Sequence, residues 1–203
     1  MIRNAVILAV TVAVLLPLAA MAQDEQTSEV SLQGMAFFTK SATNVNGTSY
    51  SATQSGGVLG TYRYHFGPNI AAELAYGFAR DTQKYSLSTE AFRIQSQVHQ
   101  VTVGLVVNVA HPKKFTPYML VGGGMVLFAP STNQLNYVTG AQTQGKGAFV
   151  YGVGINYPLQ KNFYFRAEYR GLVYAPPNFG FGGLSANSIT HSAEPSIGLS
   201  YRF

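Results

Sequence analysis

The chain has 203 residues, a formal net charge of +5, no cysteine and no tryptophan. Charged residues make up 10% of the chain, whereas a soluble domain typically has about 25%, so the composition argues against an ordinary soluble domain. The basic residues are scattered apart from Lys113 and Lys114, a pattern that excludes a nucleic-acid-binding stripe.

Residues 1–22 have the pattern of a secretory signal peptide. Arg3 provides a positive start, residues 5–18 are apolar, and Ala20 and Ala22 are small residues placed before Gln23. We expect cleavage after Ala22, Sec-type export and a single domain over residues 23–203. The alternative is a buried helix or an uncleaved membrane anchor. No later apolar run approaches about 20 residues, which excludes a helical membrane protein.

Apolar and polar residues then alternate with a period of two, which is typical of half-buried β-strands. Eight such segments occur in the mature chain. They cover residues 29–40, 58–66, 70–80, 94–109, 116–128, 147–157, 163–173 and 194–203. In the fifth of these segments, the glycine-rich stretch "YMLVGGGMVLF" does not show which residues form the apolar face and which form the polar face.

The connections between these segments alternate between short and long. Three are short, over residues 67–69, 110–115 and 158–162, and four are long and polar, over residues 41–57, 81–93, 129–146 and 174–190. Tight turns at one end and long loops at the other predict an antiparallel up-and-down barrel. The fold class is therefore all-β.

The distribution of charge decides between two kinds of barrel. A soluble barrel has an apolar interior, whereas a membrane barrel has an apolar exterior. The aromatic face of the expected strands carries no charge, and a charge facing lipid near the midplane costs about 2–4 kcal/mol. We therefore expect a transmembrane barrel with a narrow polar lumen. The charges on its inner face are Arg63, Glu73, Arg166, Glu168, Arg170, Glu194 and Arg202.

Aromatic residues lie near both ends of the expected strands, as they do at membrane interfaces. We expect an inner girdle near the tight turns that includes Tyr64, Phe66 and Phe163. An outer girdle near the loops would contain Phe38, Phe78, Phe128 and Tyr169.

The stretches "TPYMLVGGGM" and "YGVGINYPLQKNFYFRAEYRG" and the closing "SIGLSYRF" resemble OmpA-like and OmpX-like eight-stranded outer-membrane barrels. The resemblance covers the whole mature chain and implies residence in a bacterial outer membrane. It also implies a C-terminal assembly signal at Ser196, Gly198, Tyr201 and Phe203. This signal would be recognised by the barrel-assembly machinery, after escort by periplasmic chaperones.

The candidates for chemistry are weak. Some barrels of this kind act on lipid A, and "THSAE" brings His191, Ser192 and Glu194 close in sequence. Adjacent residues on a strand point to opposite faces, however, so we expect no catalysis there. The four histidines are dispersed, which indicates no metal site. We expect no cofactor.

We therefore expect a monomeric, non-enzymatic barrel with a structural or adhesin-like role and a lumen plugged by paired charges. Tyr50, Tyr137, Tyr174 and Phe179 lie in the long loops, where a surface ligand would meet them. The alternatives are a narrow channel for small solutes and a lipid A-modifying enzyme.

Overall fold

The structure, a computed structural model, describes residues 27–40, 42–43, 49–52, 54–86, 91–110, 114–131, 142–180 and 189–203. The signal peptide expected at residues 1–22 lies outside these residues, so its cleavage site stays a prediction. Within the described residues, no helix is long and apolar enough to cross a membrane.

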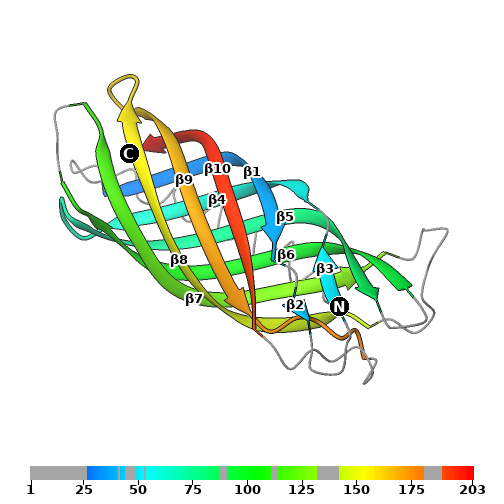
Figure 1. Cartoon of the computed structure of the whole chain (residues 1–203). Coiled ribbons are helices and arrows are strands. Elements are labelled where there is room, and N and C mark those ends of the chain that lie inside the picture. The colour runs from blue at the N-terminus through cyan, green and yellow to red at the C-terminus, as the bar shows by residue number, and fades with distance from the viewer. Residues whose placement is uncertain are drawn as a thin grey trace.

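Eight strands close into an antiparallel barrel, which confirms the predicted fold class (Figure 1). Each barrel strand pairs with the next along the chain, and the last pairs with the first. The strands are β1 (Ser28–Thr39), β4 (Ser55–His65), β5 (Ile70–Ser86), β6 (Ala91–Asn108), β7 (Thr116–Pro130), β8 (Gln144–Pro158), β9 (Phe163–Tyr174) and β10 (Thr190–Arg202).

The register of the pairs sets the tilt of the strands. Successive Cα partners lead from Ser28 once around the barrel and return to β1 at Phe38, ten residues further along. A stagger of this size in eight strands requires a tilt of roughly 40° and leaves an interior that side chains can fill. At the seam, Ser28 and Phe203 exchange two backbone hydrogen bonds of 3.0 and 2.8 Å.

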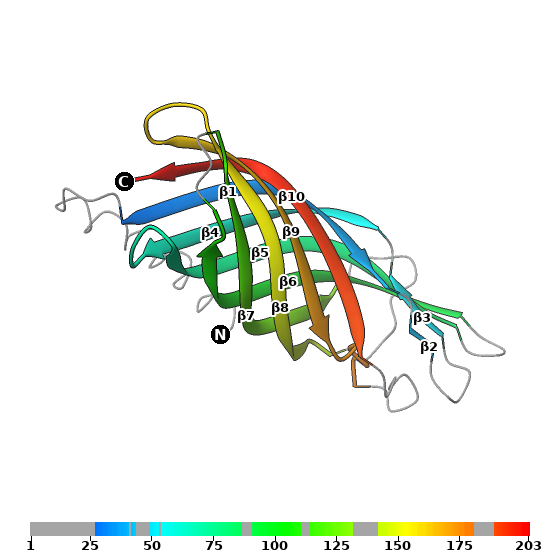
Figure 2. The same cartoon turned by 60° about the vertical axis from the view of Figure 1, so that its left-hand side comes forward.

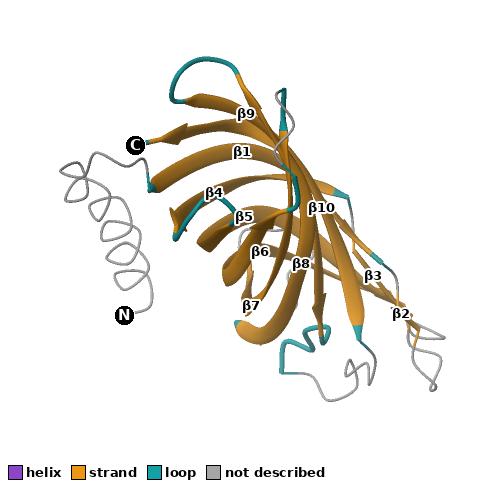
Figure 3. Ribbon diagram, turned by 90° about the vertical axis from the view of Figure 1, so that its left-hand side faces the viewer, coloured by secondary structure: helices purple, strands orange, loops and turns teal. Residues whose placement is uncertain are grey.

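Two short strands, β2 (Ala42–Thr43) and β3 (Ser49–Ala52), were not predicted from the sequence. The strand β3 pairs with the end of β5, which continues to Ser86 rather than stopping at residue 80. Figures 2 and 3 show this part of the sheet projecting past the barrel at the loop end. Short turns of outer-membrane barrels lie in the periplasm and long loops outside the cell, so the projection is extracellular.

The side chains separate into a lipid-facing set and a luminal set. Leu32, Val103 and Ile197 are among the exposed apolar residues of the outer wall. On the glycine-rich strand β7, the buried residues that face the lumen are Tyr118, Leu120, Val126 and Phe128. The assignment of Phe128 to the outer girdle is therefore wrong: its ring is 0% exposed.

Candidate functional site

The periplasmic half of the lumen contains a closed ring of two arginines and two glutamates. Arg63 on β4 pairs with Glu73 on β5 and with Glu168 on β9, the latter at 2.9 Å. Arg170, also on β9, pairs with the second oxygen of each glutamate. All four side chains are buried, and each carboxylate binds both guanidinium groups. The ring is neutral overall and joins strands on opposite sides of the barrel.

A second cluster lies on the periplasmic side of the ring. Its central residue is Glu29, which is not among the charges predicted from the sequence. One carboxylate oxygen of Glu29 accepts from Arg166, and the other accepts from Arg202 at 2.7 Å. His65 lies 3.2 Å from the same oxygen. Strand parity could have identified Glu29, because it shares a face with Gln33 and opposes Val30 and Leu32.

Uncharged groups add further hydrogen bonds to these clusters. Arg166 donates to Asn156 at 2.9 Å and to Thr61 at 3.2 Å. Tyr118 donates to Glu168, and the guanidinium of Arg63 lies 4.1 Å from the centre of the Tyr118 ring. Because ions in a narrow lumen need both counter-charges and hydrogen bonds, this arrangement is what a stable plug requires.

Glu194 stands apart from both clusters. Its Cα is paired in register with that of Arg170, yet Arg170 extends toward the ring. Glu194 is fully buried and accepts one hydrogen bond, from the amide of Gln100 at 2.9 Å. Its Oε1 atom has no hydrogen-bond partner among the described residues. The structure therefore brings together six of the seven predicted luminal charges, in two clusters. The seventh, Glu194, lies on the extracellular side of both clusters.

Apolar side chains fill most of the extracellular half of the lumen, where the carboxylate of Asp81 on β5 is also buried. The rings of Phe128 and Tyr174 lie 5.7 Å apart, and the Tyr174 hydroxyl is 2.8 Å from Ser192 Oγ. The buried apolar residues around them are Phe37, Val98, Val126, Val150, Leu172 and Phe179. We call this set, with Phe128 and Tyr174, the apolar cap.

Phe179 reaches the apolar cap from the loop that follows β9. Its φ of 51° is unusual for a residue with a side chain. Gln144 on β8 accepts hydrogen bonds from the backbone amides of Asn178 and Phe179, at 2.8 and 3.2 Å. Two of the four loop aromatics expected to meet surface ligands, Tyr174 and Phe179, are therefore buried in the barrel. Tyr137 and the side chain of Tyr50 lie outside the described part of the chain.

The pair His191 and Ser192 lies on opposite faces of β10, as strand geometry predicts. His191 lies 2.9 Å from the hydroxyl of lipid-facing Tyr151, whereas Ser192 is buried against Tyr174 and Thr39. The geometry therefore separates the imidazole from the hydroxyl that it would have to activate. Among the described residues, no group of three potential ligands could hold a metal ion.

The four residues of the expected assembly signal lie on β10 and at its end. Tyr201 and Phe203 face outward, with stacked rings 5.8 Å apart. Ser196 donates a 3.0 Å hydrogen bond to luminal Gln33. Gly198 approaches β1 so closely that a Cβ atom would lie 2.1 Å from the Leu32 carbonyl oxygen. Packing within the folded barrel therefore accounts for Gly198, and recognition by the assembly machinery stays a prediction.

A closed eight-stranded barrel with a lipid-facing apolar wall and a lumen packed with side chains defines the class of small outer-membrane barrels. The chain belongs to the family of the outer membrane protein beta-barrel domain, whose model matches residues 8–203. It is therefore a protein of the bacterial outer membrane. A comparison with curated proteins found no match.

Solved structures similar to this chain are themselves outer-membrane barrels. The outer membrane protein OprG from Pseudomonas aeruginosa is 15% identical with a TM-score of 0.61, covering 89% of this chain and 99% of that one. Neisserial surface protein A is 12% identical with a TM-score of 0.61, covering 87% and 97%. Ail, the attachment invasion locus protein of Yersinia pestis, is 18% identical with a TM-score of 0.51, covering 87% and 99%. At these identities the similarity establishes the fold.

Proposed function

We propose that this chain is a non-conducting, non-enzymatic outer-membrane barrel with a structural or surface-interaction role. The observation that carries the proposal is the filling of the lumen along its length. The ion clusters occupy the periplasmic half, and the apolar cap occupies the extracellular half. A mainly apolar segment and a segment of paired ions in series both oppose the passage of ions.

The surface role is supported by the part of the sheet that projects beyond the barrel. The strands β2 and β3 and the ends of β5 and β6 continue the hydrogen-bonded ladder into the extracellular loops (Figure 2). Exposed sheet edges provide backbone groups to which a partner strand can bind. Ail was solved in complex with the heparin analogue sucrose octasulfate, so a barrel of this fold can bind such a ligand.

Conductance in a planar lipid bilayer tests the plug. We expect the refolded parent chain to give no channel steps. Because the two segments lie in series, Glu73→Ala alone should stay closed. Glu73→Ala combined with Phe128→Ala should open steps, since the ring loses a shared counter-ion and the apolar cap loses an aromatic ring. A Val103→Ala variant on the lipid-facing wall should stay silent. Steady conductance of the parent chain would instead support a narrow channel.

The surface role and the absence of catalysis need separate experiments on cells. Deletion of residues 42–52, which contain β2 and β3, should reduce adhesion to host-cell or glycan surfaces while the barrel still shows its heat-dependent gel mobility. Lipid A mass spectra should be the same with and without the gene. A changed acylation pattern would favour the enzyme alternative.

Assembly is part of the same proposal. We expect periplasmic chaperones and the barrel-assembly machinery to deliver a monomer into the outer membrane. Deletion of Phe203 should slow insertion, because it removes a terminal aromatic and both backbone bonds to Ser28. Normal amounts of the heat-shifted form in cells would contradict this role.

A further inference from the structure

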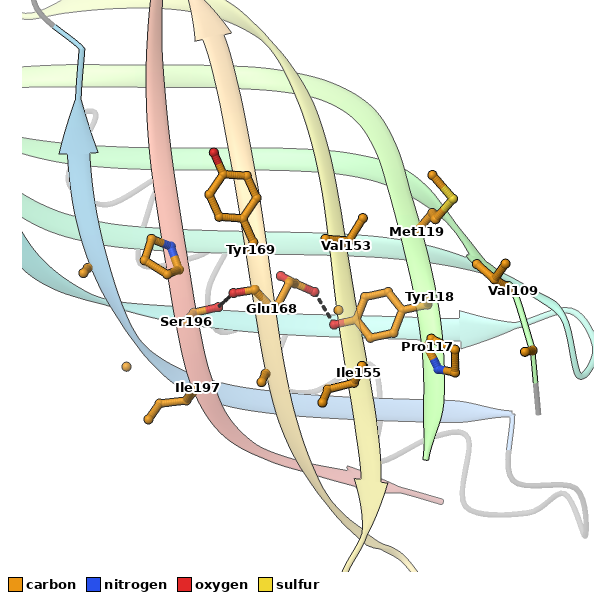
Figure 4. A pocket seen from close by; sticks show the side chains of 16 residues that line it. Val109, Pro117, Tyr118, Met119, Val153, Ile155, Glu168, Tyr169, Ser196 and Ile197 are labelled. Carbon is orange, nitrogen blue, oxygen red and sulfur yellow. Dashed lines mark hydrogen bonds between the residues drawn. The ribbon is translucent and has the colours of Figure 1, made fainter. Parts of the chain in front are cut away.

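A long apolar furrow crosses the outer wall of the barrel (Figure 4). It runs perpendicular to the strands, between two neighbouring rows of outward-facing side chains that are aligned by the sheet register. One row is Met119, Val153, Tyr169, Pro195 and Ala36, and the other is Pro117, Ile155, Ala167, Ile197 and Gly34.

Small residues line the furrow on β1 and at one position of β9. Gly34, Ala36 and Ala167 contribute little or no side chain, while Met119 and Ile155 form walls at its other end. A Cβ atom added at Gly34 would meet no heavy atom within 4 Å, so the space beside β1 is open. The furrow faces the hydrocarbon region, where any gap must be filled by another apolar group.

We propose that this furrow binds one acyl chain of a phospholipid from the periplasmic leaflet. From β7 to β1 it crosses four strand intervals, or about 19 Å at the usual spacing of ~4.8 Å. Because the strands are tilted by roughly 40°, the furrow climbs obliquely through about 12 Å, most of the roughly 15 Å height of one leaflet. Its size and course therefore suit a single extended hydrocarbon chain.

The position of the lower end selects the phospholipid headgroup. The furrow starts at Val109, Ala110 and Pro117, beside the periplasmic turn between β6 and β7. Lys114 lies exposed in that turn, three residues before Pro117. An ammonium group at the membrane interface favours a headgroup with net negative charge, such as phosphatidylglycerol, over a zwitterionic one.

A second copy of the chain suits the furrow less well. The furrow curves around a convex wall over five strands, so another rigid barrel would touch it along a short line only. A flexible acyl chain can follow the whole curve and contact both rows of side chains. In a bilayer, the hydrophobic effect does not drive two proteins to associate, because lipid tails are as apolar as the side chains that face them.

Retention of phospholipid in mild detergent, measured by native mass spectrometry, tests the proposal. Gly34→Leu fills the furrow, and Gly147→Leu is a matched control because a Cβ there also meets nothing within 4 Å, on strand β8 outside the furrow. We expect Gly34→Leu to lower the retained fraction of phosphatidylglycerol about tenfold, as for loss of roughly two buried methylene contacts. The control should match the parent. Equal retention by both variants would overturn the proposal.

A second measurement leaves the furrow backbone and Gly34 intact and exploits the absence of tryptophan from the chain. Met119→Trp places a fluorescent reporter beside the furrow, and Val103→Trp places one on β6 away from it. In phosphatidylcholine vesicles with a small fraction of chain-brominated phosphatidylglycerol, only the reporter at position 119 should show excess quenching. Adding Lys114→Gln to that variant should reduce the excess. Equal quenching of both reporters, or a dimer that replaces lipid at the furrow, would refute acyl-chain binding.

Discussion

The two halves of the lumen are filled by different kinds of side chain: ion pairs in the periplasmic half and mainly apolar groups in the extracellular half. In the periplasmic half, Arg63 and Glu168 belong to ion clusters in which each charge meets several partners. In the extracellular half, Phe128 and Phe179 fill the barrel with hydrocarbon. The difference teaches that an inward-facing position of a membrane barrel need not be polar: it needs only to be filled and satisfied.

The two halves should also respond differently to mutation. An ion cluster depends on every member, because removal of one leaves another buried charge without its partner. An apolar cap loses only the contacts and the volume of the group removed. Variants in the two halves therefore test whether the difference in chemistry is also a difference in energetics.

The largest expected effect is that of Glu168→Leu. This change removes the acceptor shared by Arg63, Arg170 and Tyr118, and it leaves Glu73 as the one carboxylate of the ring for two buried guanidinium groups. We expect the free energy of unfolding to fall by about 3–5 kcal/mol, the usual cost of breaking a buried ion pair. Urea unfolding in phospholipid vesicles, followed by gel mobility, measures it. The lipid-facing variant Val103→Leu is the control, and an unchanged midpoint for Glu168→Leu would show that the ring contributes no stability.

A smaller loss is expected from Phe128→Ala in the apolar cap. The change removes a ring that contacts Tyr174 and leaves a cavity between well-packed strands. We expect a loss of about 3 kcal/mol, at the low end for such truncations. The same unfolding experiment measures it, with Phe128→Leu as the milder control. If both variants unfold like the parent, the cap is loosely packed and the contrast between the two halves fails.

The sequence predicted the barrel well, because alternation directly reports which side chains meet lipid. Parity placed Arg63, Glu73, Arg166 and Glu168 on the inner face. The same signal fails where lipid contact ends: the extension of β5 to Ser86 is polar on both faces, so its pattern does not differ from that of a loop.

The errors inside the barrel have a related cause. Alternation identifies two faces of a strand, but on β7 both faces are apolar, so the pattern misses Tyr118 and assigns Phe128 to lipid. Glu29 has the correct parity, but it is only the second residue of its strand, where alternation has barely begun. The contacts between particular charges depend on side-chain directions in three dimensions. For example, Arg170 pairs with the two glutamates of the ring and not with its register neighbour Glu194. No pattern along one strand encodes such contacts.

Glu194 lies at the boundary between the two halves. Its replacement should change the free energy of unfolding least, but the sign of that change distinguishes the two kinds of packing. It is a buried carboxylate with one amide donor and no ion pair among the described residues. Replacing a buried carboxyl group that has no ion pair with an amide of the same shape removes the desolvation cost that its charged form would carry. We therefore expect Glu194→Gln to leave stability unchanged or to raise it by up to about 1 kcal/mol.

The matched comparison is Glu168→Gln, the same substitution on the neighbouring strand. It exchanges a carboxylate that serves two guanidinium groups for an amide that places N–H donors against them, so it should destabilise the barrel. Opposite signs for the two variants, in one unfolding assay, would show that ion pairing rather than burial decides the value of a luminal glutamate. Equal losses would mean that Glu194 belongs energetically to the charged half.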